Sequence, residues 1–215
     1  MSKRPTPRGE NLRRALAQEA ARIMAEHGIR DFLVAKRKAA ERFGVHEGAV
    51  LPKNTEIEEA LVAYQRLFGG TVHRESLQAL RHAALAAMRR LPEFEPRLVG
   101  SVLSGTATEH SPVQLHLFAD CAESVVMRLI DQGLAHEVTE KRVRMSPERV
   151  LVCPGLRLRI EDRPIEATVF PPEGIRQAPV SPVDGRPMRR ASALEVEALL
   201  GGCEPADHLT AATCP

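Results

Sequence analysis

Apolar residues recur every three or four positions through roughly the first 90 residues, which is the spacing of helices with one buried face. Four segments carry this pattern, and a glycine or a proline follows each of them closely. They are 10–27, 29–43, 55–68 and 73–90. The pattern therefore predicts a helical region over 1–92 that either packs on the rest of the protein or forms the interface of a homo-oligomer.

After residue 92 the pattern changes to the alternation that is typical of strands. One face of the segment 112–118 carries Val113, Leu115 and Leu117, and the other carries Pro112, Gln114, His116 and Phe118. Similar alternation predicts strands over 136–145, 150–160 and 165–170, after a helix that ends at Gly133. The sequence therefore predicts an α+β protein, with a mixed sheet and flanking helices over 93–190. A short helix and a mobile tail are expected over 191–215.

Local signals predict where several of these elements begin and turn. Thr55 with Glu58, and Asp120 with Glu123, have the spacing of residues that cap the first turn of a helix. Residues 161–164 read as the turn of a β-hairpin. Each signal predicts the boundary of one element, independently of the hydrophobic pattern.

Composition narrows the classes of function. Apolar residues make up 43% of the 215 residues, which supports a globular core, and aromatic residues only 3%, too few for a base-stacking platform. The net charge of +2 gives no global field for nucleic acid, although the segment 1–14 is locally basic. Nucleic-acid binding is therefore disfavoured, and the basic segment is expected to be a solvated arm.

The cysteines and the hydropathy pattern bear on the compartment. The four cysteines form no CxxC pair, so neither a zinc ribbon nor a disulfide framework is expected. No apolar run approaches the ~20 residues of a membrane span, and the amino terminus lacks the apolar segment of a secretion signal. We expect a cytoplasmic protein with reduced thiols and no membrane partner.

A glycine-serine pair stands at the end of the first short apolar run of the sheet region. This pair is Gly100 and Ser101, followed by a polar loop with Gly105 and then by Ser111, immediately before the alternating segment 112–118. The arrangement resembles the signature of the polymerase-β-like nucleotidyltransferases, in which a Gly-Ser pair ends one strand and an Asp-x-Asp pair lies on the next. The resemblance implies that Gly100, Ser101, Gly105 and Ser111 lie at a nucleoside triphosphate (NTP) site, and we count Gln114 and His116 of the next strand among its substrate-binding residues.

The carboxylates of that signature are replaced in this chain. Such carboxylates hold magnesium, which clamps the attacking and leaving oxygens of a phosphoryl group. Here Pro112 and Gln114 take their two positions, so a divalent cation would lose two anionic ligands. His116 on the same face could add a nitrogen ligand, but imidazole suits zinc or iron better than magnesium. The magnesium site implied by the resemblance is thus broken; we predict no metal ligands and leave the cofactor open, with Mg²⁺ as the candidate.

The family also has a third carboxylate on a later strand, and Glu166 is the candidate for that catalytic position. Antiparallel pairing of 150–160 with 165–170 would bring Arg157 and Arg159 near Glu166, or alternatively near a phosphate. An ordinary strand glutamate that faces water is the competing interpretation. The sequence therefore leaves two interpretations of Glu166 open: a catalytic carboxylate, or a strand residue that faces solvent.

A proline-rich loop over 171–190 follows the last predicted strand. Its arginines could clamp a triphosphate, and we include Arg186 among the substrate-binding residues. The competing interpretation is a surface loop without a catalytic role. Arg189 and Arg190 belong to the same basic group.

The sequence contains none of the motifs of other common nucleotide or hydrolase sites, such as a P-loop or a GxGxxG fingerprint. We therefore predict a nucleotidyltransferase-like pseudoenzyme that binds a nucleotide with impaired or absent metal-dependent transfer. The alternatives are an active nucleotidyltransferase with an atypical metal site formed by Glu166, Gln114 and His116, and a non-catalytic module that binds protein or nucleic acid.

Overall fold

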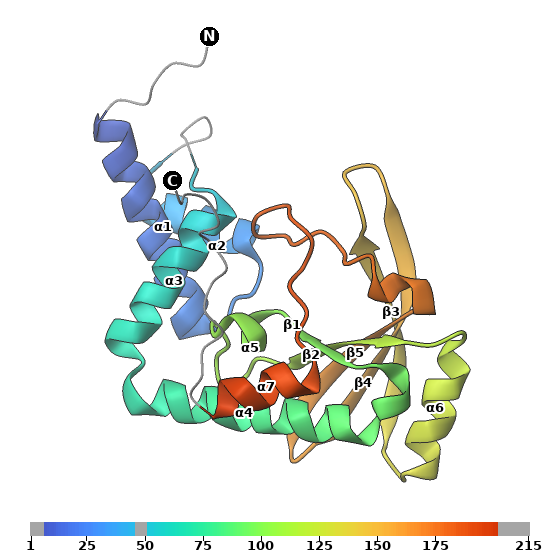
Figure 1. The fold of residues 1–215 in the computed structure, drawn as a ribbon. Coiled ribbons are helices and arrows are strands. Elements are labelled where there is room, and N and C mark those ends of the chain that lie inside the picture. Colours follow the sequence, from blue (N-terminus) through green and yellow to red (C-terminus); the bar gives the residue numbers. More distant parts are fainter. Residues whose placement is uncertain (1–6, 46–50, 202–215) are drawn as a thin grey trace, which may run out of the picture.

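The structure, a computed structural model, describes residues 7–45 and 51–201 (Figure 1). The predicted tail over 202–215 and the first six residues of the predicted basic arm lie outside the described residues, whereas residues 7–14 of that arm belong to the first helix. Four helices come first: α1 (Pro7–His27), α2 (Phe32–Arg42), α3 (Asn54–Phe68) and α4 (Gly70–Arg90). Five strands follow: β1 (Arg97–Val99), β2 (Val113–Phe118), β3 (His136–Arg144), β4 (Val150–Ile160) and β5 (Arg163–Phe170). The remaining helices are α5 (Ser101–Ser104), α6 (Ala122–Asp131) and α7 (Ala193–Leu200), with 3₁₀ turns at Pro92–Phe94 and Pro172–Ile175.

The protein is α+β, as the sequence predicts: helices first, then a five-stranded mixed sheet with interspersed helices. The strand order is β1-β2-β5-β4-β3. All neighbouring pairs are antiparallel except β2 and β5, which run parallel. The predicted hairpin between β4 and β5 is confirmed, and its turn residues Glu161 and Asp162 have φ angles of 51° and 59°.

The alternation predicted for β2 places one face of the sheet in the main core. Val113, Leu115 and Leu117 are buried there with apolar residues of β4, β5, α4, α6 and α7. Figure 1 shows these three helices on one side of the sheet and the segment 171–190 on the other. The face of β2 that carries Gln114 and His116 is therefore turned toward the proline-rich segment.

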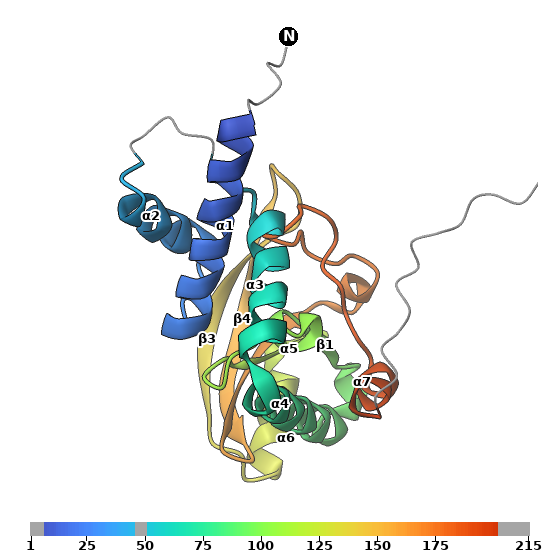
Figure 2. The same cartoon turned by 90° about the vertical axis from the view of Figure 1, so that its left-hand side faces the viewer.

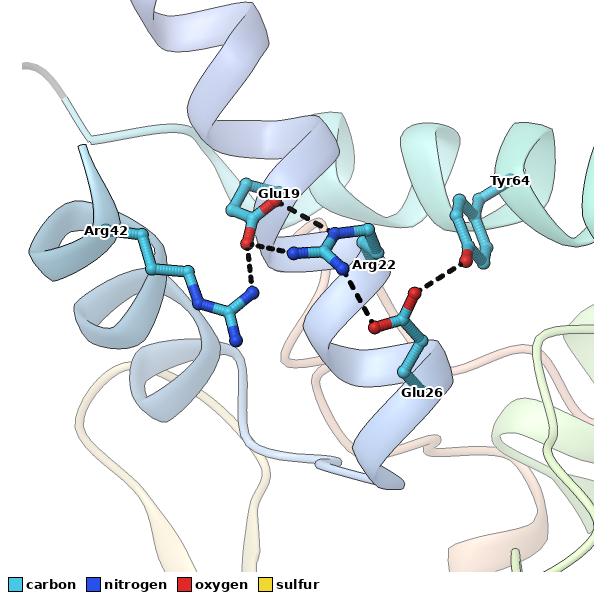
Figure 3. Close-up of polar contacts among 5 residues, drawn as sticks. All are labelled: Glu19, Arg22, Glu26, Arg42 and Tyr64. Carbon is cyan, nitrogen blue, oxygen red and sulfur yellow. Dashed lines mark hydrogen bonds and ion pairs between the residues drawn. The ribbon is translucent and has the colours of Figure 1, made fainter.

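The first three helices have a core of their own. Leu16, Ala20 and Ile23 of α1 are buried against α2 and α3. Polar contacts reinforce this cluster, because Glu19 of α1 binds Arg42 of α2 and the Tyr64 hydroxyl of α3 donates to Glu26 over 3.0 Å (Figure 3). The buried residues of α4, in contrast, belong to the sheet core.

Two predicted helix caps are wrong. In α3 the Lys53 backbone N–H donates to Glu56 over 2.7 Å, so the capping glutamate is Glu56 and not Glu58. Helix α6 begins after Cys121, whose extended backbone starts the helix without a side-chain cap, and Asp120 lies one residue too early. In both cases the helix starts after the last residue with an extended backbone, Lys53 or Cys121, and not at a nearby side chain of a capping type.

Among the described residues, no helix is both long and apolar enough to cross a membrane.

Candidate functional site

Gly100 makes the corner between β1 and α5. Its φ and ψ angles are 73° and −153°, a region that is essentially open only to glycine. A Cβ atom built there would lie 2.1 Å from Oε1 of Gln114, because Val99 and Gln114 are partners across β1 and β2. The glycine thus lets the chain turn tightly over the Gln114 side chain and places Ser101 beside it.

A cavity of about 460 Å³ lies beside this corner. Its walls come from four parts of the chain: the end of α1 with the link to α2, helix α3, the segment from Gly100 to Gln114, and the proline-rich segment. Four of the predicted site residues line it, namely Gly100, Ser101, Ser111 and Gln114. The volume is within the range of small-molecule sites, which is roughly 300–1,000 Å³.

The polar groups of the cavity floor differ in whether they are already bonded. The Ser111 side chain is buried, and its Oγ accepts a hydrogen bond of 2.9 Å from the Thr108 backbone. Neither the Ser101 hydroxyl nor the Gln114 side-chain amide has a hydrogen bond with any described residue. These two groups are therefore available to a ligand.

Three charged side chains that also line the cavity, Arg30, Arg189 and Glu58, form no ion pair with the described part of the chain. Burial raises the pKa of the half-buried Glu58 carboxyl, and the negative charges of Asp184 and Glu59 add to this shift. Asp184 lines the same cavity. The wall thus offers two cationic groups and an acidic pair that a ligand could contact.

Glu166 lies next to Gln114 in the parallel pair of β2 and β5, but it does not line the cavity. Lys141 Nζ on β3 donates to its carboxylate, and Arg157 Nε on β4 lies 3.9 Å away. Burial by itself would raise the pKa of Glu166, but Lys141 first, and then the charges of Arg30 and Arg157, hold it below its usual value. The carboxylate is ionised and already engaged within the sheet. The predicted approach of Arg157 is confirmed.

The residues at this position do not fit magnesium. Pro112 has no side-chain ligand, Gln114 supplies a neutral amide, and the Glu166 carboxylate is bound by Lys141. Within residues 7–45 and 51–201, no three His, Cys, Asp or Glu side chains are grouped so that they could hold a metal ion. The residues at this position therefore provide no magnesium site.

His116 is buried on the same sheet face, outside the cavity lining. Its Nδ1 accepts a hydrogen bond of 3.0 Å from Nε of Arg190, and its ring meets Phe170 edge-on with centroids 4.7 Å apart. Burial, together with the charges of Arg190 and Lys141, lowers the pKa of His116 to about 3. The ring is neutral, and it anchors the end of the proline-rich segment to β2.

Two further predicted residues lie away from the cavity. Gly105 ends α5 with a φ angle of 83°, and its carbonyl is 3.3 Å from Nε2 of His73 on α4. Arg186 lines a separate shallow hollow, where it lies near Lys53 and Asn54 at the start of α3. Neither residue lines the cavity, although the Gly105 backbone N–H donates to the carbonyl of Ser101.

Sequence reasoning missed Arg30 and Glu58 as site residues and assigned Glu58 to a cap. Arg30 lies in the short link between α1 and α2, where no pattern identifies it. Glu58 had a signal: with Leu61 and Gln65 it lies on one face of α3 at the i, i+3, i+7 spacing. Gln65 on this face is buried and donates to the Thr106 carbonyl over 3.0 Å. Glu58 and Gln65 thus form a polar stripe beside the apolar residues of α3, on the side of the helix that faces the Gly-Ser segment.

Comparison of the chain with protein-family models, with curated proteins and with solved structures finds no match.

Proposed function

We propose that this protein is a nucleotidyltransferase-like nucleotide-binding protein that takes a nucleoside triphosphate into the cavity beside Gly100 and does not need a divalent ion to bind it. The observation that carries the proposal is the convergence of unbonded groups on one cavity. The Ser101 hydroxyl and the Gln114 amide lie at the floor, and Arg30 and Arg189 lie in the wall.

The charges around the cavity support an anionic ligand. Guanidinium groups bind phosphate through paired, charge-assisted hydrogen bonds, and neither Arg30 nor Arg189 is neutralised by an ion pair with a described residue. The two arginines can neutralise the charge of the phosphates, which is the role of magnesium in the family that the sequence resembles. At the ligand positions of that family, the engaged Glu166 and the neutral Gln114 leave no anionic pair to receive the ion.

Titration calorimetry on single variants tests the proposal. We expect Arg30→Gln and Arg189→Gln to weaken triphosphate binding by about tenfold or more, because a hydrogen bond to a charged group contributes roughly 1.5–3 kcal/mol. Arg37→Gln is the matched control, since Arg37 is exposed on α2, is not part of the cavity wall and has no hydrogen bond or ion pair with a described residue to lose. Equal affinities of all three variants and the wild type, or no binding by the wild type, would overturn the proposal.

The second candidate is an active nucleotidyltransferase with an atypical metal site. The observation that favours it is the register, which sets Glu166 directly beside Gln114. Incubation with labelled nucleotides and magnesium, manganese or zinc separates the two candidates. Pyrophosphate release that is lost in both Ser101→Ala and Glu166→Ala would establish the enzyme, and its absence from the wild type would favour the binding protein.

A further inference from the structure

The charged groups of the cavity are not mixed evenly but divided between two ends. Arg189 adjoins Arg190, which donates to His116 on β2, so Arg189 lies toward the sheet with Ser101 and Gln114, and Arg30 lines the same cavity. Glu58 lies one turn after Asn54 on α3, and the Asn54 amide donates to the Pro182 carbonyl, so Glu58 lies toward the part of the proline-rich segment that carries Asp184. The cavity therefore has a cationic and hydroxyl end at the sheet and an acidic end between α3 and residues 181–184.

Other contacts fix the acidic end. The Asn54 side-chain amide at the start of α3 donates to the carbonyl of Pro182 over 2.6 Å, so the proline-rich segment is joined to α3 close to Glu58. In Figure 2, α3 lies beside the orange-red segment 171–190. Apolar side chains of Met24, Ile29, Phe32 and Leu61 line the same cavity. The cavity thus combines apolar walls with a carboxyl group to which no described residue donates a hydrogen bond.

A carboxylate only accepts hydrogen bonds, so it selects a base edge that only donates. Guanine presents the N1–H and the 2-amino group side by side. Adenine and cytosine place a ring nitrogen acceptor next to their amino group, and uracil flanks its single N–H with two carbonyl oxygens; a carboxylate repels these acceptors. Guanine is therefore the base whose edge matches an ionised Glu58.

We propose that the bound nucleotide carries guanine, with the Glu58 carboxylate accepting hydrogen bonds from N1–H and the 2-amino group while the phosphates lie toward Ser101 and Arg30. This inference rests on the proposed function, because it names the ligand of the same cavity. It assigns Glu58 to base recognition and leaves phosphate binding to the opposite end.

Calorimetry with GTP, ATP, CTP and UTP tests the inference on the full chain. We expect the wild type to bind GTP at least about tenfold more tightly than the other three, since each hydrogen bond to a charged group is worth about a factor of ten or more. In Glu58→Gln this preference should fall to threefold or less, because the amide replaces one acceptor by a donor. Glu59→Gln should keep the preference: Glu59 is the next residue, is exposed and lies outside this cavity.

Inosine triphosphate supplies a test that needs no variant. It lacks only the 2-amino group, and we expect it to bind the wild type several-fold more weakly than GTP. Equal affinity for all four nucleotides would overturn the assignment of guanine and leave the proposed function standing. A GTP preference that survives in Glu58→Gln would overturn the role of Glu58 in base recognition. Absence of binding by every triphosphate would overturn both.

Discussion

Gly100 is the residue on which the shape of the cavity floor depends most directly. Its backbone geometry is open only to glycine, and a Cβ atom would overlap with the Gln114 side chain. We predict that Gly100→Ala lowers the free energy of unfolding by about 1–3 kcal/mol and weakens nucleotide binding. Urea unfolding and calorimetry measure the two effects.

Gly133 is the matched control for this substitution. It also has a positive φ angle, 65°, but a Cβ atom there would meet nothing within 4 Å. Gly133→Ala should therefore cost only the left-handed strain, about 1 kcal/mol, and should leave binding unchanged. Equal losses of stability in the two variants would contradict the steric role given to Gln114.

His116 predicts a specific pH dependence of stability. The buried ring has a pKa of about 3, whereas an exposed histidine has about 6.5, so below pH 6.5 the unfolded chain binds a proton that the folded protein does not. The folded state therefore loses stability as the pH falls from 6.5, by roughly 1.4 kcal/mol per pH unit from this group. Chemical unfolding at pH 7.5, 6.0 and 5.0 measures the slope.

His116→Asn separates this effect from other titrations. An amide oxygen can still accept the hydrogen bond from Arg190, but the side chain does not titrate. The variant should be less stable at pH 7.5 because of lost packing against Phe170, and its stability should change much less between pH 6.5 and 5. A slope as steep as that of the wild type would show that other groups cause the acid sensitivity.

At the residue scale the sequence indicates which groups carry chemistry better than it indicates where they lie. Gly100, Ser101, Ser111 and Gln114 follow one another closely in the chain, so local pattern suffices to bring them to one corner. Glu58 reaches the same cavity from a helix more than 40 residues away. Its place depends on how α3 packs, which no local signal contains.

At the scale of elements, the β3–β4–β5 part of the sheet is joined by one charged group. Glu166 on β5 accepts from Lys141 on β3 and lies close to Arg157 on β4. Glu166→Gln should lower the free energy of unfolding by about 1–3 kcal/mol, because it leaves a partly buried lysine without its partner. Urea unfolding measures this loss.

A double-mutant cycle with Lys141→Met tests the pairing itself. We expect the double variant to be more stable than the sum of the two single losses predicts, since it removes both charges together. Additive losses would mean that the two side chains act independently. Glu166 would then be free for another role, including the catalytic one considered from the sequence.

The type of most elements was predictable from the hydrophobic period, but their exact starts were not, and the short helix α5 lies where the sequence predicted a polar loop. Strand β4 has the predicted bounds, 150–160, because alternation persists through the whole segment. The starts of α3 and α6 were misplaced, because a nearby Thr or Asp with a suitable glutamate resembles a cap even where the preceding backbone begins the helix elsewhere.

At the scale of the whole molecule, the cavity lies where two separately packed regions meet. The α1–α3 cluster supplies Arg30 and Glu58, and the sheet region supplies the Gly-Ser corner and the proline-rich segment. The sequence predicts each region separately, but their meeting depends on long-range contacts such as those from Gln65 to Thr106 and from Asn54 to Pro182. For this reason the floor of the site and Arg189 could be predicted, whereas the wall residues from α1–α3 could not.

The proposed function depends above all on the binding of a nucleoside triphosphate to this cavity without a divalent ion. The most direct measurement is calorimetric titration of the wild type with GTP and ATP, once in excess EDTA and once in excess magnesium. We expect saturable one-to-one binding in EDTA, with an affinity that differs by no more than about threefold from the affinity in magnesium. Binding that occurs only with magnesium, or none under either condition, would contradict it.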